Sequence, residues 1–363
     1  MSKRVFYPFI MIYISAIVYL AYTTPITPHE ANIFYSDNGI VNFLMHYGYD
    51  MFGGFIGIRL FFTLIGFISI YLYYSMTAIY LERESDRYSA TTLYLILPGI
   101  ITALVLANIS ILVIPLVLIF LISYDKDIKW LQIAIMGVLF FIHEASVIFF
   151  ITILIYGFIN KNRLLTLSSG IFLTLSIIIA RGVEIGGRPS GHFIDIFGLY
   201  TALFSPLIFI YFFYTLYRIL LREEKNILWY ISFGALIVSL LLSIRQRISI
   251  TDFAPYVIIS VVLMLDSFNR RLRVRLPIYQ KYYKIGFRVV ISTLISVSLL
   301  IVLHQPLFVD RGYSFTDKLY EPFNLAKELK AKNIDCYSVD KRDKVYQLRF
   351  YGIESCPRYE FKE

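Results

Sequence analysis

Charged residues are scarce in this sequence. Asp, Glu, Lys and Arg together make up 16% of its 363 residues, whereas a soluble globular domain carries roughly a quarter. Hydrophobic residues reach 58% of the chain. A surface that faces water needs more charge than this. The composition therefore excludes an ordinary soluble protein and indicates an all-α polytopic membrane protein.

Cysteine is almost absent as well. The two cysteines, Cys336 and Cys356, both lie in the segment after His304, which is richer in charge than the rest of the chain. On the oxidising side of a membrane, such a pair is expected to form a disulfide bond. The alternative is two independent reduced cysteines.

A cleavage site for a signal peptide is also missing, because no small-x-small pattern follows the first apolar run, Val5 to Tyr22. We interpret this run as a retained first span. The stretches 88–123 and 130–159 are each too long for one span and short for two, and we divide each in two. About eleven transmembrane helices result, at residues 5–23, 54–80, 88–105, 107–123, 130–143, 145–159, 164–181, 196–217, 227–244, 250–268 and 285–303.

Basic residues are absent from the loop 24–53 and gather in other connections, most densely at 270–275. Eleven spans with a cytoplasmic N-terminus place these clusters inside and the loop 24–53 outside, as the positive-inside rule requires. The net charge of +9 then reflects topology and contacts with lipid headgroups rather than a nucleic-acid partner. The prediction is a membrane domain at 1–304 and a small extracytoplasmic α/β domain at 305–363. In the latter, 323–332 is expected to be helical and 345–351 to be a strand.

Polar residues near the predicted outer face are the candidates for chemistry. His29 and Glu30 follow two prolines and begin a short amphipathic helix, where Glu30 could take a proton from an acceptor hydroxyl or simply cap the helix. His143 and Glu144 interrupt an apolar stretch, either as a functional pair or as a turn that reaches water.

Three arginines on the same side form a candidate anion site. Arg245 and Arg247 end a span at the outer face, where cations are otherwise disfavoured, and Arg188 lies in a glycine-rich loop. Guanidinium groups bind phosphate with two parallel hydrogen bonds, which favours a phosphate ligand over the alternative of lipid headgroups. No spacing typical of metal ligands, no P-loop and no Ser-His-Asp pattern is present in the sequence.

These features together resemble the GT-C superfamily of membrane glycosyltransferases, especially the protein O-mannosyltransferase and lipid A aminoarabinose transferase group. The similar motifs are His29-Glu30-Ala31-Asn32 after the first span, Gly57-Ile58-Arg59-Leu60 at the start of the second, and the segment 247–255. Two positions depart from the family pattern. His29 replaces the first acid of an acidic pair, and Asn108 stands where a second carboxylate is often found.

The resemblance implies a transferase at the extracytoplasmic face of a bacterial inner membrane. It would move a sugar from a polyprenyl-phosphate donor to a glycan, lipid or protein acceptor, with no metal or cofactor. Arg247, Arg245 and Arg188 would hold the donor phosphate. Glu30 would act as the base, with His29 as the alternative, and His143, Glu144 and Asn108 would support the site. The rival interpretations are an O-antigen polymerase or ligase and, with no inverted repeat to favour it, a transporter.

Overall fold

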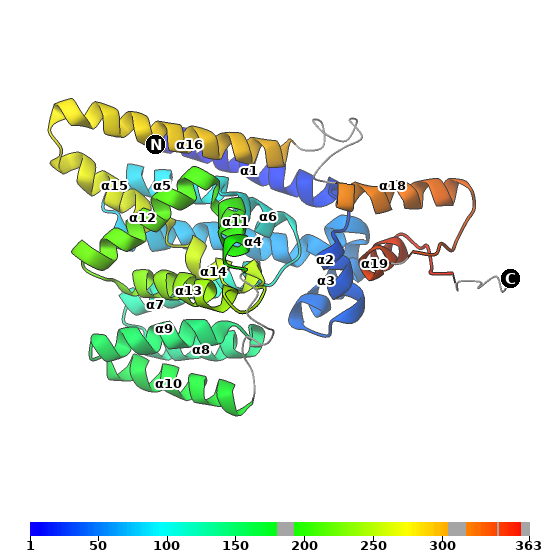
Figure 1. The fold of residues 1–363 in the computed structure, drawn as a ribbon, viewed down its shortest axis with the longest axis horizontal. Coiled ribbons are helices and arrows are strands. Elements are labelled where there is room, and N and C mark those ends of the chain that lie inside the picture. Colours follow the sequence, from blue (N-terminus) through cyan, green and yellow to red (C-terminus); the bar gives the residue numbers. More distant parts are fainter. Residues whose placement is uncertain (180–191, 304–316, 340, 357–363) are drawn as a thin grey trace. The chain divides into compact units, whose positions relative to one another are not determined.

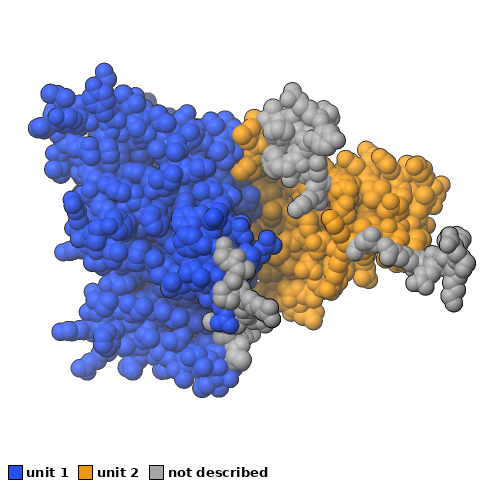
Figure 2. Space-filling model, viewed as in Figure 1, with its two compact units in different colours: residues 1–14, 64–104, 109–299 blue, residues 15–63, 105–108, 300–363 orange. Residues whose placement is uncertain are grey.

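The computed structural model describes residues 1–179, 192–303, 317–339 and 341–356, which form a helical fold (Figure 1). The predicted site residue Arg188 lies outside these ranges. The chain divides into two compact units (Figure 2). Unit 1 comprises residues 1–14, 64–104 and 109–299, and unit 2 comprises residues 15–63, 105–108 and 300–363. The C-terminal segment thus belongs to the same unit as the first long loop.

Three helices are long and apolar enough to cross a membrane: α1 (Lys3–Thr23), α4 (Gly54–Tyr80) and α16 (Pro277–Val302). They have 21 to 27 residues, which corresponds to about 30–40 Å of helix. Two bent pairs are comparably apolar. They are α5 (Glu84–Ile96) with α6 (Pro98–Val105), bent by 67°, and α11 (Phe193–Phe204) with α12 (Pro206–Arg222), bent by 105°. By length and composition, the described residues therefore contain three to five spans.

Five shorter apolar helices account for most of the other predicted runs. They are α7 (Ser110–Asp125), α8 (Lys129–Ile142), α9 (Ser146–Ile159), α10 (Arg163–Ile178) and α13 (Ile227–Ser243). Within the described residues, each predicted run thus falls on helical structure.

Three of the predicted runs are not continuous helices, and the run 88–105 is interrupted at Leu97, between α5 and α6. The run 196–217 breaks at Ser205, whose positive φ of 79° ends α11 before Pro206 begins α12. The run 250–268 is divided into η1 (Ile250–Asp252), α14 (Ala254–Ile258) and α15 (Val261–Val274). Proline at the first turn of a helix is favourable, because it lacks the N–H that would have no partner there.

Packing in unit 1 brings several helix ends together. Helix α9 packs against α10 and α13, α7 packs against α8, and α14 packs against both α7 and α13. The short η1 contacts α11 and α14. The buried side chains are mostly aliphatic and aromatic, as in a close-packed core. This arrangement places the turn after α8, the end of α13 and the start of α11 around η1.

Unit 2 contains α2 (Pro28–Ser36), α3 (Ile40–Phe52), the first residues of α4, α18 (Asp317–Ala331) and α19 (Arg342–Phe350). Gly53 and Gly54, with φ of 63° and 58°, make the turn between α3 and α4. These two helices approach so closely that a Cβ atom on Gly48 would lie 2.3 Å from the carbonyl oxygen of Gly57. The turn and the crossing bring the start of α4 to α2.

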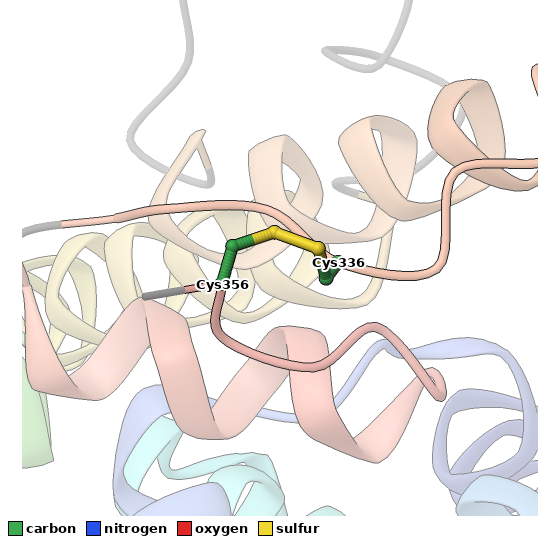
Figure 3. The surroundings of a disulfide bond; sticks show 2 residues. All are labelled: Cys336 and Cys356. Atoms are coloured by element: carbon green, nitrogen blue, oxygen red, sulfur yellow. A yellow bond between two sulfur atoms is a disulfide. The ribbon is translucent and has the colours of Figure 1, made fainter. Parts of the chain in front are cut away.

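The C-terminal segment corrects one prediction and agrees with two. The expected strand at 345–351 is wrong, because α19 covers it, and the one β-type contact in the described part of this segment is an isolated bridge between Cys336 and Glu354. The expected helix at 323–332 falls on α18, which ends one residue earlier, at Ala331. A disulfide bond joins Cys336 and Cys356, with Cα atoms 5.2 Å apart (Figure 3). Ala326, Leu329, Leu348 and Ile353 form a small core in this segment.

Candidate functional site

The local sequence explains the start of α2. The Thr27 hydroxyl accepts a hydrogen bond from the Glu30 backbone N–H at 3.0 Å, and Glu30 Oε2 accepts one from the Thr27 N–H at 3.0 Å. This reciprocal capping box, with Pro28 at the first helical position, satisfies N–H groups that a helix start leaves without partners. Thr27 and Glu30 therefore fix where the helix begins.

Glu30 also forms a buried ion pair with Arg59 of α4. Arg59 Nε donates to Glu30 Oε1 at 2.8 Å, and Arg59 Nη2 donates to Oε2 at 2.7 Å. The backbone N–H of Ala107 donates to Oε1 at 2.9 Å. Exposure is 1% for Glu30 and 0% for Arg59. The pair thus joins the first loop, the start of α4 and the segment 105–108, all within unit 2.

The Arg59 guanidinium holds the end of α1 through backbone carbonyls as well. Its Nη1 donates to the carbonyl oxygens of Ala21 and Thr24 at 3.1 and 2.7 Å, and its Nη2 donates to that of Pro25 at 3.0 Å. The last carbonyls of a helix have no partner within the helix. Arg59 supplies donors to them, and so a single guanidinium stabilises both the end of α1 and the charge of Glu30.

These contacts determine the chemistry of Glu30. Burial opposes its negative charge, but Arg59 and the N–H groups of Thr27 and Ala107 outweigh burial and hold the pKa of the carboxyl below its ordinary value of 4.5. A carboxylate with a lowered pKa and several hydrogen bonds is a weak proton acceptor. It is well suited to anchoring the loop.

His29 differs from Glu30 in exposure. Its side chain is exposed in the first turn of α2, whereas that of Glu30 is buried. Asn108 follows Ala107, is 8% exposed, and donates from Nδ2 to the Leu106 carbonyl at 3.0 Å. Unit 2 therefore gathers the predicted residues His29, Glu30 and Asn108 together with Arg59, whose pairing the sequence did not predict.

A second polar cluster lies in unit 1 at the turn after α8. His143 is 4% exposed, and its Nδ1 lies 3.0 Å from the Tyr256 hydroxyl of α14. Its Nε2 lies 3.7 Å from Asp252 Oδ1 of η1. Glu144 is exposed. The predicted pair therefore separates, with the histidine packed against η1 and α14 and the glutamate facing outward.

The two described arginines of the predicted anion site, Arg245 and Arg247, also belong to unit 1, and their side chains are exposed. Arg247 is 83% exposed, and its Nε lies 3.9 Å from Asp195 Oδ2 at the start of α11. The same carboxylate oxygen lies 3.1 Å from His192 Nδ1. Arg245 is exposed as well. This contact with Asp195 leaves most of the Arg247 guanidinium exposed.

Comparison with known proteins identifies the fold. No family model and no curated protein matches the sequence. Among solved structures, ArnT from Cupriavidus metallidurans bound to undecaprenyl phosphate is similar, with a TM-score of 0.62, 12% identity, and coverage of 98% of this chain and 85% of ArnT. ArnT from the same organism in the apo state gives a TM-score of 0.57, 12% identity, and coverage of 96% and 84%. The predicted resemblance to the GT-C fold is confirmed, since ArnT is a lipid A aminoarabinose transferase of that superfamily.

Proposed function

We propose that this protein is a membrane glycosyltransferase that moves a sugar from a polyprenyl-phosphate donor to an acceptor. The observation that carries the proposal is the likeness in fold to ArnT over 98% of the chain. One of those ArnT structures contains undecaprenyl phosphate. The apolar helices and the positive-inside charge pattern support a place in a bacterial inner membrane, with the N-terminus inside and the C-terminus outside. As the resemblance implies, the reaction is proposed to need no metal or cofactor.

The donor phosphate is proposed to bind at Arg247, with Arg245 in support. Transfer of the sugar leaves a phosphate on the lipid, and its charge grows as the glycosidic bond breaks. A guanidinium placed there stabilises this charge most in the transition state, which lowers the barrier. The 83% exposure of Arg247 supports this role, because a ligand can reach the group without displacing a buried partner.

The base is proposed to be His29, and Glu30 is proposed to be its anchor. This reverses the order predicted from the sequence. Glu30 is buried and accepts hydrogen bonds from Arg59, Thr27 and Ala107, so an acceptor hydroxyl would have to displace them. His29 is exposed on the adjacent position of α2. A neutral imidazole can take the proton of a hydroxyl as the new bond forms.

The direct test is the glycan profile of a deletion strain. Mass spectrometry of its envelope glycans is expected to show the loss of one sugar, and its lipid extract is expected to accumulate a polyprenyl-phosphate sugar. Unchanged glycans and lipids would overturn the proposal. A shift in polymer length with every sugar retained would instead favour a polysaccharide polymerase or ligase.

Variants restored to that strain separate the roles. Arg247→Ala is expected to abolish the transfer, and Arg247→Lys to weaken it, because an ammonium keeps the charge but lacks the two-pronged geometry. Arg273→Ala is the matched control, since it removes an exposed arginine from α15 instead.

His29→Asn is expected to reduce turnover by about 10²–10⁴-fold, the usual contribution of a placed base. Wild-type transfer by Arg247→Ala and His29→Asn would refute both assignments.

A further inference from the structure

Three side chains of α19 form a stripe along one face of that helix. Arg342, Tyr346 and Arg349 are spaced i, i+4 and i+7, which places them on the same side. Gln347 and Leu348, on other sides of α19, are buried in unit 2, where Gln347 Nε2 donates to the Ile26 carbonyl at 2.9 Å. The stripe therefore lies on a more exposed side of α19 than the buried Gln347 and Leu348.

The stripe continues onto α2 through stacked rings. The Tyr346 ring lies against the Tyr35 ring of α2, with centroids 5.8 Å apart and planes inclined by 28°. Arg342 covers the Tyr346 ring at 5.4 Å and donates from Nε to the Tyr346 hydroxyl at 3.0 Å. Arg349 covers the Tyr35 ring at 4.9 Å. The four side chains form a ladder in the order Arg342, Tyr346, Tyr35, Arg349.

In this ladder, each of the two guanidinium groups lies over a tyrosine ring, which orients it for binding an anion. Stacking on an aromatic face orients a guanidinium plane and leaves its edge N–H groups directed outward. Both arginines are exposed, and neither forms an ion pair with an acidic residue in the described part of the chain. The neighbouring Lys344 differs, because it is paired with Glu321 at 2.7 Å. An arginine already held in place loses less entropy when it binds a ligand.

We propose that this ladder is the binding surface for an acidic acceptor glycan, with Arg342 and Arg349 each binding one phosphate or carboxylate group. The proposal rests on the proposed transferase function for the identity of the bound molecule. Seven residues of α19 separate the arginines, or about 10 Å along the helix. The acceptor therefore carries at least two anionic groups, as a phosphorylated sugar or an acidic repeating chain does.

The position of Tyr35 favours an acceptor over the donor. Tyr35 and His29 lie on the same short helix, six residues or about 9 Å apart along its axis. The two side chains lie about 120° apart around the helix, so a glycan held by the ladder reaches the proposed base along the exposed side of α2. Exposed Asn32 and Ser36, which are hydrogen-bonded to each other at 2.8 Å, add polar groups on α2 that match sugar hydroxyls.

Calorimetry with the full-length protein in neutral detergent tests the surface without any turnover. The probes are glucose 1,6-bisphosphate, glucose 6-phosphate, glucose and inorganic phosphate. The bisphosphate is expected to bind at least about tenfold more tightly than either probe with a single phosphate, because two charge-assisted contacts form instead of one. Arg342→Gln and Arg349→Gln are each expected to weaken it about tenfold. Lys344→Gln, on the same helix, is the control and is expected to bind as the wild type does.

Three results would overturn the inference. Equal affinity for the bisphosphate and inorganic phosphate would mean adventitious anion binding only. An equal loss in Lys344→Gln would mean a general effect of charge. Competition by phosphatidylglycerol nanodiscs, but not by phosphatidylcholine nanodiscs, would assign the surface to lipid headgroups. Because no donor is present, failure here leaves the transferase proposal intact, and failure of the glycan assay leaves the binding result unchanged.

Discussion

The buried pair of Glu30 and Arg59 allows a quantitative prediction. Glu30→Gln keeps the size of the side chain but leaves the Arg59 charge in a site where both groups are at most 1% exposed. Removal of one partner from a buried ion pair costs about 3–5 kcal/mol, mainly because the remaining charge is desolvated without compensation. We therefore expect α2 to lose about 3–5 kcal/mol of local stability in Glu30→Gln.

The second variant separates the charge from the carbonyl contacts. Arg59→Met removes the positive charge and also the donors to the carbonyls of Ala21, Thr24 and Pro25. In the double variant with Glu30→Gln, no charge remains buried, so the two losses are not additive. The expected coupling free energy is about 2–3 kcal/mol, at the upper end for residues in contact. The half-exposed pair of Lys344 and Glu321 is expected to give less than about 1 kcal/mol.

Hydrogen exchange measured by mass spectrometry gives these free energies locally. Amides of α2 and α3, residues 28–52, report the opening of the loop in the full-length protein. If Glu30→Gln leaves their protection unchanged, within about 0.5 kcal/mol, the anchor role is wrong. If that variant also loses turnover by 10²–10⁴-fold, Glu30 is the base, as the sequence first suggested.

Four further outcomes are expected. The lowered pKa of Glu30 means that its stabilising contribution is present above pH 4.5 and is lost as the pH falls further, so the protection of α2 amides, relative to the intrinsic exchange rate at each pH, should fall only below about that pH. Replacing Cys336 and Cys356 with Ser should destabilise the α18–α19 region by about 3 kcal/mol, which faster exchange of α19 would show. Gly48→Ala should destabilise the α3–α4 turn by about 1–3 kcal/mol in the same assay, because its Cβ would meet a backbone oxygen of α4. A C-terminal alkaline phosphatase fusion should be active, whereas a C-terminal green fluorescent protein that fluoresces would refute the outward C-terminus.

Local sequence signals predicted part of the site well. Thr27, Pro28 and Glu30 carry the signature of a helix start, and α2 begins where they place it. The sequence did not reveal what Glu30 contacts. Arg59 is the single charged residue in the 27 residues of α4, and a lone charge in such a helix requires a partner. The lone arginine therefore indicates that a partner exists but does not identify it. The partner, Glu30, is 29 residues away in the sequence, and the turn between α3 and α4 brings it to Arg59.

The prediction at 345–351 failed for a different reason. Val345 to Tyr351 alternates apolar and polar residues like a strand, but a short segment can satisfy a period of 2 and a period of 3.6 at once. The same residues place Arg342, Tyr346 and Arg349 on one side of a helix and bury Gln347 and Leu348 on others. Packing against α2 and α18 decided between the two patterns.

Unit 2 also has a consequence for biogenesis. The donor of the hydrogen bond between Gln347 and Ile26 is made 321 residues after the acceptor, an interval of roughly 15–65 s at usual rates of synthesis. During that interval α2 can cap itself and pair with Arg59, but α19 does not yet exist to cover it. The helix that carries His29 therefore gains the packing of α19 only after Arg342–Phe350 has been made. A chain that terminates before α19 would insert its spans and still leave Tyr35 without the Tyr346 ring and the Ile26 carbonyl without Gln347.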